Sequence, residues 1–256
     1  PYVDDMGVPQ LNPTGLKLYG KDKKNMVGAL GSLEIPTQVV RSADFGQLDL
    51  DAAGAWVLKP ANGRMSSGVR VAQKDELPGV LSELFTDPKT PDQLLQPYLG
   101  AGQVPPEVYG ASVVDRQVID AARYHKVPAE LRMFVLKSES GVVTVPILRL
   151  AAKQSEFIDG TTDTYVDVEV EGDTAALLEH TALEIAGNLA RSAGTAGEPF
   201  IAAVDMLYDG ERYWVMEANL RAPTLPTTRE NPHAARQIYP ALADTLKSMS
   251  VGVDNE

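Results

Sequence analysis

Two carboxylates and an amide, Asp205, Glu217 and Asn219, interrupt an otherwise apolar stretch at residues 200–219. This stretch reads as two β-strands joined by a tight turn at residues 209–210. Carboxylate and amide oxygens are hard ligands of the kind Mg²⁺ prefers, and phosphate oxygens and water complete its shell. The stretch therefore predicts a magnesium site if the three side chains point the same way. The alternative is that they lie on a solvated sheet face.

The length of the turn decides this, because successive side chains of a strand alternate between two faces. A two-residue loop puts Asp205 on the opposite face from Glu217. A three-residue loop that ends at Gly210 pairs Asp205 with Tyr213, and Asp205, Glu217 and Asn219 then point the same way. Such a loop needs a left-handed residue at its last position, which a glycine supplies. We therefore predict the three-residue loop, with Tyr213 and Glu217 on one face of an unbroken second strand.

Three cationic side chains stand where they could meet a phosphate or a carboxylate. Lys59 ends an apolar strand and precedes a small-residue loop, 61–68, whose backbone N–H groups could cover phosphates. Most loops of this kind are only turns, and an exposed lysine is usually just solvated. Arg132 and Arg149 each lie inside an apolar strand, where an arginine is costly unless it is paired or faces a ligand. A structural ion pair and a ligand contact are both left open for each arginine.

Composition bounds the class of protein. The chain has 256 residues, 44% of them hydrophobic, a formal net charge of −12 and a pI of about 4.7. This acidity argues against broad nucleic-acid binding and against attraction to anionic lipid. The chain contains no cysteine, no signal peptide is visible, and no apolar run approaches the length of a membrane span. These features fit a cytoplasmic protein.

The elements that must position these residues can be read along the chain. Residues 1–20 look like a lead-in, and 100–126 and 152–164 look irregular. We expect helices over 26–33, 76–85, 173–194 and 232–249, and strands over 35–40, 55–60, 69–72, 93–99, 131–136, 142–150 and the two arms of the 200–219 hairpin.

Taken in order, these segments resemble the ATP-grasp superfamily, and within it the glutathione-synthetase-like or RimK-like carboxylate–amine ligases. No single motif is specific, and the order and spacing carry the resemblance. The motifs are Asp22-Lys23 with Ile35-Pro-Thr37, Val57-Leu-Lys-Pro60 followed by residues 63–68, Leu95-Gln-Pro-Tyr-Leu99, Glu130-Leu-Arg-Met-Phe-Val135 with Ile147-Leu-Arg149, and Val204-Asp205 with Glu217-Ala-Asn219. Pro97 departs from the family pattern, because it removes one N–H donor from the expected hinge.

The resemblance implies an α+β protein with the ATP-grasp fold, in which two α+β subdomains with mainly antiparallel sheets clamp ATP. Residues 1–20 would then be the end of a missing or reduced N-terminal domain. Residues 21–95 would form a small lid subdomain, and residues 96–256 a large subdomain with the metal site.

The resemblance also implies a role for each site residue. ATP would be bound by Lys23, Lys59, Ser66, Ser67, Gly68, Gln96, Tyr98 and Leu99. Magnesium, as two ions, would be bound by Asp205, Glu217 and Asn219. The catalytic residues would be Arg132, Arg149 and Arg221, facing phosphate or the acceptor carboxylate.

The implied reaction is ATP-dependent ligation of a carboxylate to an amine through an acylphosphate, with an amino acid or peptide as the carboxylate partner. Nucleic acid and membrane are not expected as partners, and a homodimer is left open. Two alternatives remain: a non-catalytic, regulatory nucleotide-binding module, and a kinase that stops after phosphorylating its acceptor.

Overall fold

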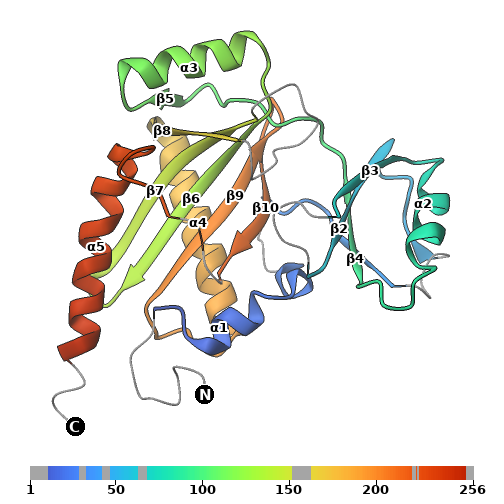
Figure 1. Cartoon of the computed structure of the whole chain (residues 1–256), viewed down its shortest axis with the longest axis horizontal. Helices are drawn as coiled ribbons and strands as arrows, with labels where there is room; N and C mark the ends of the chain where they lie inside the picture. Colours follow the sequence, from blue (N-terminus) through green and yellow to red (C-terminus); the bar gives the residue numbers. More distant parts are fainter. Residues whose placement is uncertain are drawn as a thin grey trace.

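The computed structural model describes residues 11–28, 33–41, 47–62, 68–151, 163–220, 223 and 225–251. Its strands form two separate sheets, a small one and a large one (Figure 1). In chain order the elements are α1 (Thr14–Tyr19), η2 (a 3₁₀ turn, Lys23–Met26), β1 (Gln38–Val40), β2 (Ala55–Pro60), β3 (Arg70–Gln73), α2 (Leu77–Leu84), β4 (Gln93–Pro97), β5 (Val108–Gly110), α3 (Val113–Tyr124), β6 (Ala129–Ser138), β7 (Gly141–Leu150), β8 (Thr164–Val170), α4 (Gly172–Ser192), β9 (Phe200–Tyr208), β10 (Tyr213–Asn219) and α5 (Pro232–Val251).

The small sheet has the strand order β1-β4-β2-β3, and all its pairings are antiparallel. Helix α2 covers one of its faces (Figure 1). Trp56 and Leu58 alternate with less buried residues along β2 and pack with Leu77 and Leu81 of α2. The apolar face of β2 is buried because α2 covers it, and this contact explains why the small sheet and α2 pack together.

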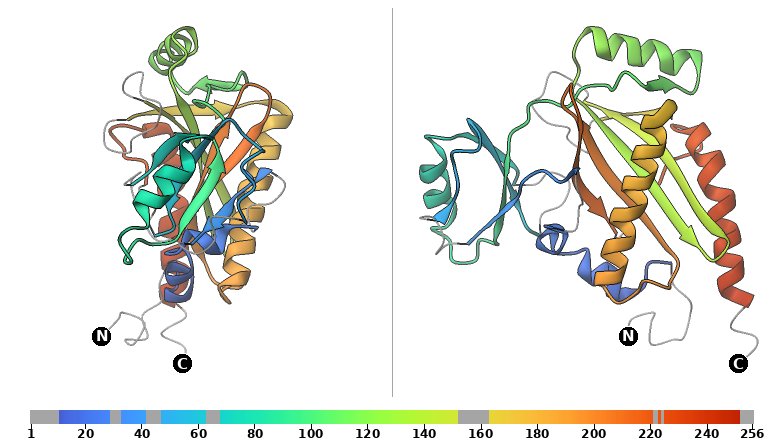
Figure 2. Two further views of the ribbon diagram at one scale, coloured as in Figure 1. Left: turned by 90° about the vertical axis from the view of Figure 1, so that its right-hand side faces the viewer. Right: turned by 180° about the vertical axis from the view of Figure 1, so that it is seen from behind.

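The large sheet has the order β10-β9-β6-β7-β8-β5 and is also antiparallel throughout. Helix α4 lies on one face and α5 on the other (Figure 2). The α4 face holds the larger core, which includes Leu131, Val204 and, from α1, the fully buried Leu16. Both faces of β6 and β9 are therefore covered along much of their length, which explains their nearly continuous apolar sequence.

Two expectations about the elements are wrong. The helix expected over 26–33 is only the single turn η2, since Val27 is already extended and Gly28 has a φ of +79°; residues 29–32 lie outside the described part. The stretch 100–126, expected to be irregular, contains β5 and the twelve-residue helix α3. The loop expected over 152–164 lies mostly outside the described residues, and Thr164 begins β8.

The turn of the β9–β10 hairpin also differs from the prediction. Tyr208 pairs with Tyr213, so the turn has four residues, 209–212, and not three. A β-bulge at Met216 then shifts the pairing by one residue, and Glu217 lies directly opposite Asp205. The bulge turns Tyr213 away from the face of Glu217, into the core beneath α4.

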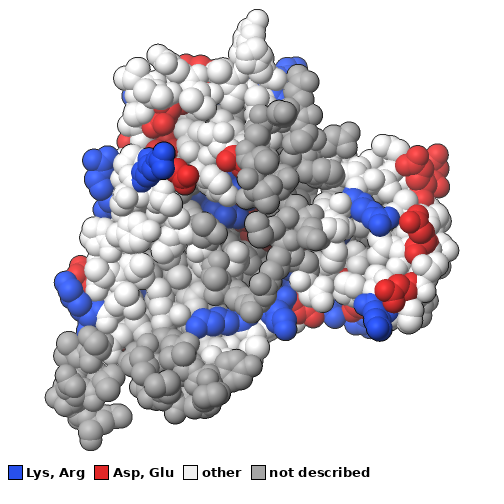
Figure 3. Space-filling view, in the orientation of Figure 1, with Lys and Arg blue, Asp and Glu red and all other residues white. Residues whose placement is uncertain are grey.

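Charge is unevenly distributed over the surface. Acidic side chains gather at the outer edge of the small sheet, over α2 and its neighbours (Figure 3); Glu76, Glu83 and Asp87 are exposed there. A polyanion would be repelled from this edge, so recognition of one needs cations elsewhere. No helix in the described ranges has the length and apolarity to cross a membrane.

Candidate active site between the two sheets

One half of one face of the large sheet is charged. Arg132 on β6 is directly opposite Asp205 on β9, which is opposite Glu217 on β10, while Glu130 is opposite Arg149 on β7. Directly paired residues point to the same face, so all five side chains share it. The other half of the face is apolar and is covered by α5 through Phe134, Leu136, Val145, Ile147, Ile201 and Ala203.

Arg132 and Asp205 form a buried ion pair. The Arg132 Nε donates to Asp205 Oδ1 at 2.6 Å, and Nη2 donates to Oδ2 at 2.7 Å. Burial alone would raise the pKa of Asp205, but the charge and hydrogen bonds of Arg132 outweigh it and hold that pKa below its usual range. Asp205 is therefore a carboxylate with a fixed orientation.

Arg149 is bracketed by two carboxylates. Its Nη1 donates to Glu130 Oε1 at 2.6 Å, and its Nη2 donates to Asp163 Oδ2 at 3.0 Å. Burial and the charge of Asp205 raise the pKa of Glu130 to about 8, although Arg149 lies beside it. Of the two readings left open for the arginines, the structure shows an ion pair for both, and Arg149 also borders the pocket described below.

Glu217 is held less tightly. Its Oε2 accepts a hydrogen bond of 2.5 Å from Lys23 Nζ of η2, and the two side chains are 30% and 22% exposed, respectively. Asn219 lies opposite Ala203, on the same face as Asp205 and Glu217. The three oxygen-bearing side chains therefore do share a face, as predicted, although the turn that was expected to place them there is wrong.

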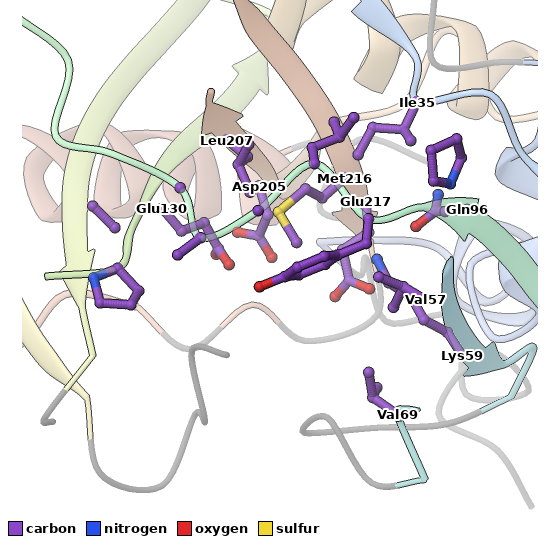
Figure 4. A pocket seen from close by; sticks show the side chains of 18 of the residues that line it. Ile35, Val57, Lys59, Val69, Gln96, Glu130, Asp205, Leu207, Met216 and Glu217 are labelled. Carbon is purple, nitrogen blue, oxygen red and sulfur yellow. The ribbon is translucent and has the colours of Figure 1, made fainter. Parts of the chain in front are cut away.

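A pocket lies between this charged face and the small sheet. Its wall includes Lys23, Lys59, Asp205 and Glu217, contributed by η2, β2, β9 and β10. Figure 4 shows Lys59 reaching from the small sheet toward Glu217, with Glu130 and Asp205 beyond it. Burial is the main cause that lowers the pKa of Lys59, and the nearby charge of Lys23 adds to it. The ammonium of Lys59 has no ion pair closer than 4 Å within the described residues.

The expected hinge also lines the pocket, through Gln96, Pro97, Tyr98 and Leu99. The Tyr98 N–H donates to Ala55 O at 2.9 Å, so Tyr98 faces β2 with its backbone. Backbone groups alternate in direction along an antiparallel strand. Pro97 therefore turns its backbone carbonyl away from β2, and its missing N–H costs the sheet no hydrogen bond to β2.

The Gln96 side chain is buried and fixed. Its Nε2 donates to Thr37 Oγ1 at 2.9 Å, and that hydroxyl donates to Ile35 O at 2.7 Å. The amide oxygen of Gln96 is consequently turned toward the cavity (Figure 4).

Gly68 is at the end of the small-residue loop. Its φ is +77°, and a Cβ there would lie 2.9 Å from Pro60 Cγ, so only glycine fits without strain. The other expected phosphate and acceptor contacts, Ser66, Ser67 and Arg221, lie outside the described residues.

Sequence reasoning missed the apolar wall of the pocket. Ile35, Val57, Val69, Leu207 and Met216 line it together with the hinge (Figure 4). Nothing in their type or spacing distinguishes them from core residues. Asp163, which binds Arg149, was missed for a different reason: it falls in a polar stretch with no strand pattern.

Three solved structures resemble the chain across most of its length. D-cycloserine synthetase DcsG has a TM-score of 0.59 at 20% sequence identity, covering 92% of this chain and 73% of that one. D-alanine–D-alanine ligase from Bacillus anthracis, complexed with ATP, gives 0.60 at 17% identity, covering 98% and 73%. The ATP-grasp ligase PsnB, complexed with minimal precursor, gives 0.56 at 14% identity, covering 96% and 66%.

No protein-family model matches the chain, and no curated protein matches it in sequence. The similarity is thus one of structure: a mixed α+β chain with mainly antiparallel sheets. The chain has the ATP-grasp fold.

Proposed function

We propose that the chain is an ATP-dependent ligase that joins a small carboxylic acid to an amine. The observation that carries the proposal is the position of Lys59: it extends from one sheet toward the acidic face of the other, across a single pocket. Cations from one layer and oxygen ligands from the other can then hold a nucleotide phosphate between them. The likeness to ATP-grasp ligases supports this reading through the fold.

The hinge suits an adenine ring. We infer that the Pro97 carbonyl accepts from the exocyclic amine, because it turns away from β2, and that the Leu99 N–H donates to a ring nitrogen, because Leu99 lines the same pocket. The Gln96 amide oxygen adds a second acceptor for the amine. Val57, Val69 and the other apolar wall residues would pack against the ring faces.

Magnesium fits the donor set on this face. Each oxygen of Asp205 keeps a lone pair beyond the one used by Arg132, and the Oε1 of Glu217 is not the oxygen that binds Lys23. Asn219 would supply the third ligand. Among the described residues no group of three or more His, Cys, Asp or Glu side chains has the geometry of a metal site, so the amide and the nucleotide must complete this one. When bound, Mg²⁺ would neutralise charge on the transferred phosphoryl group.

The proposed reaction has two steps. An oxygen of the acceptor carboxylate attacks the γ-phosphorus of ATP, the bond to the β–γ bridging oxygen breaks, and ADP leaves. The amine then attacks the carbonyl carbon of the acylphosphate, and inorganic phosphate departs as the amine loses a proton. Lys23 and Lys59 would hold the phosphates, and Arg149 would face the acceptor or the phosphoryl group. Arg132 would act by keeping Asp205 ionised and oriented, and Arg221 remains a proposed acceptor contact.

One observation favours a different function, a nucleotide-binding module without turnover. Both oxygens of Asp205 are already engaged by Arg132, and Glu217 is engaged by Lys23. A site whose charged side chains are already paired with one another can bind a nucleotide without catalysing phosphoryl transfer. Formation of ADP and inorganic phosphate together, dependent on an added acid, separates the two functions; ADP without phosphate would indicate a kinase.

The first experiment is thermal unfolding with and without Mg-ATP. Saturation at one hundred times the dissociation constant should stabilise the protein by about 2.7 kcal/mol. The Glu217→Gln variant should lose the magnesium-dependent part of this shift. Glu211→Gln is the matched control, since Glu211 is an exposed acid of the same hairpin.

Amino acids and short peptides are then screened as acceptors, with release of ADP and phosphate as the readout. A shift with Mg-ATP but no turnover with any acid would favour the binding module. No shift with ATP, ADP or GTP at millimolar concentration would overturn the nucleotide site itself.

A further inference from the structure

The turn η2 is anchored to the large sheet. Met26 is 4% exposed and belongs to the core beneath α4. Asn25 exchanges two hydrogen bonds with Tyr19, at the end of α1: the tyrosine hydroxyl donates to Asn25 O at 3.0 Å, and Asn25 Nδ2 donates to Tyr19 O at 2.8 Å. The ion pair of Lys23 with Glu217 adds a contact to β10.

The same turn also holds the small sheet. The Lys23 N–H donates to Ala61 O at 2.8 Å, directly after β2. Lys24 Nζ donates to Asp92 Oδ2 at 2.7 Å, directly before β4. Ala61 and Asp92 are joined to each other as well, since the Ala61 N–H donates to Asp92 O at 2.9 Å. One turn therefore meets the small sheet where β2 ends and β4 begins (Figure 1).

Lys24 is oriented for this contact by its own neighbour. Asp22 Oδ1 accepts from the Lys24 N–H at 3.0 Å and begins the 3₁₀ turn. Its Oδ2 lies 3.3 Å from Lys24 Nζ. Arg41, which directly follows β1, also contacts Asp92: its Nε lies 3.6 Å from Asp92 Oδ2. These side chains (Asp22, Lys24, Arg41 and Asp92), together with the backbone contact of Lys23 with Ala61, form a small charged joint between the two sheets.

This joint fixes geometry that the proposed ligase needs. Ala61 is two residues after Lys59, and Lys23 binds both Ala61 and Glu217. The joint therefore sets the distance between the Lys59 ammonium on the small sheet and the Glu217 carboxylate on the large sheet. We propose that Lys24 and Asp92 are positioning residues of the nucleotide site: their ion pair holds the small sheet against η2 at the spacing at which Lys59 and Glu217 can share one phosphate chain. The inference rests on the proposed function for its purpose, but its geometry can be tested without any ligand.

The test uses spin-label distance measurements. The chain has no cysteine, so a pair introduced as Ser82→Cys on α2 and Glu179→Cys on α4 is the only labelled pair. The parent should give one narrow distance distribution between the two sheets. Lys24→Met and Asp92→Asn should each broaden or shift it, while their melting temperatures stay close to that of the parent.

Two controls separate positioning from a general effect. Lys21→Met removes an exposed lysine of the same segment that forms no ion pair within the described residues, and it should leave the distribution unchanged. Lys24→Arg, which keeps a cation between Asp22 and Asp92, should give the narrow distribution of the parent. An unaltered distribution in Lys24→Met, or an equal change in Lys21→Met, would overturn the proposal.

A second readout links the joint to the ligand. Lys24→Met should weaken Mg-ATP binding by about tenfold, equivalent to 1.4 kcal/mol, with Lys21→Met unchanged. If the parent binds no nucleotide, the proposed function fails while the distance measurement still decides the role of the joint. If the distances change but the affinity does not, the joint holds the sheets without positioning the site, and the proposal is wrong.

Discussion

Arg132 and Asp205 lie opposite each other on β6 and β9 and are joined by two hydrogen bonds in the buried part of the site. Their positions are 73 residues apart in the chain, so the pair ties together strands that meet only in the folded sheet. The pair makes Asp205 both a structural group and a candidate ligand, and substitutions there cannot separate the two roles.

The first prediction follows from this pair. Asp205→Asn should destabilise the protein by roughly 3–5 kcal/mol, because it removes the carboxylate that pairs directly with the buried Arg132 guanidinium. Urea unfolding monitored by circular dichroism measures the loss. Adding Arg132→Met to Asp205→Asn should recover part of it. Stability equal to the parent in Asp205→Asn would mean that solvent reaches the pair.

The second prediction concerns Lys59. Lys59→Met should keep or raise the melting temperature, since it removes a buried ammonium, and should abolish stabilisation by Mg-ATP. Lys74→Met, which removes an exposed lysine next to the same sheet, should keep that stabilisation.

Since burial lowers the pKa of Lys59, its charge, and with it ATP affinity, should fall as pH rises through that lowered value. Titration calorimetry between pH 7 and pH 10, on the parent and on Lys59→Arg, measures this. A pH dependence that persists in Lys59→Arg would assign the titration to another group.

The third prediction concerns pH and the turn of the hairpin. Asp209 Oδ1 accepts from the N–H groups of Glu211 and Arg212 at 2.9 Å each, and Oδ2 accepts from Trp214 Nε1 at 2.6 Å. Burial raises the pKa of Asp209, but these hydrogen bonds outweigh it, and the pKa lies below its usual value. A lowered folded-state pKa means that the carboxylate stabilises the fold above the unfolded-state pKa, about 3.9.

Asp209→Asn should therefore cost about 1 kcal/mol at pH 7, and the difference from the parent should shrink as pH falls below about 4. Urea unfolding at a series of pH values from 7 to 2.5 measures both. A difference that stays constant down to pH 2.5 would show that the charge of Asp209 contributes nothing.

The fourth prediction concerns Asn12, which anchors the start of the described chain. Its Nδ2 donates to Ile201 O and Leu220 O, and its Oδ1 accepts from the Ile201 N–H, each at 2.6 Å. Asn12→Ala leaves these buried backbone groups without partners and should cost on the order of 3 kcal/mol.

Asn12→Gly should be milder than Asn12→Ala by about 1 kcal/mol, because the φ of Asn12 is +60° and glycine adopts it freely. Thermal unfolding of the two variants side by side gives the comparison. Equal losses would mean that the backbone there is not under constraint.

The strands of the large sheet could be predicted because their apolar pattern is nearly continuous, as burial on both faces demands. Helix α3 could not. Only Ile119 and Ala122 are its buried residues, and Val113, Val114 and Val118 are exposed. Its apolar residues recur at helical spacing, but most of them are exposed and therefore do not mark the buried side.

The same limit applies to the site. The face that Asp205 shares with Glu217 followed from the predicted turn, whose length is wrong. Alternation along a strand says only which side chains of that strand share a face, as for Glu217 and Asn219. It does not say which partner lies opposite, because that depends on the register of strands far apart in the chain. The sequence left Arg132 and Arg149 open between ion pair and ligand contact, and only the pairing with Asp205 and Glu130 decides in favour of the ion pairs.

The bulge at Met216 has a consequence for how the hairpin can vary. Eleven residues lie between Asp205 and Glu217 in the chain. Directly paired residues account for an even number of them, so an odd number must lie in the turn and in a bulge taken together. Here a four-residue turn and one bulged residue together supply it. If Met216 were paired and not bulged, it would lie opposite Asp205, and the Glu217 carboxylate would point into the apolar core. Deleting Met216 removes the bulge and leaves Glu217 opposite Asp205. The hairpin should therefore tolerate loss of the bulged residue, because a regular strand after the four-residue turn places Glu217 on the same face.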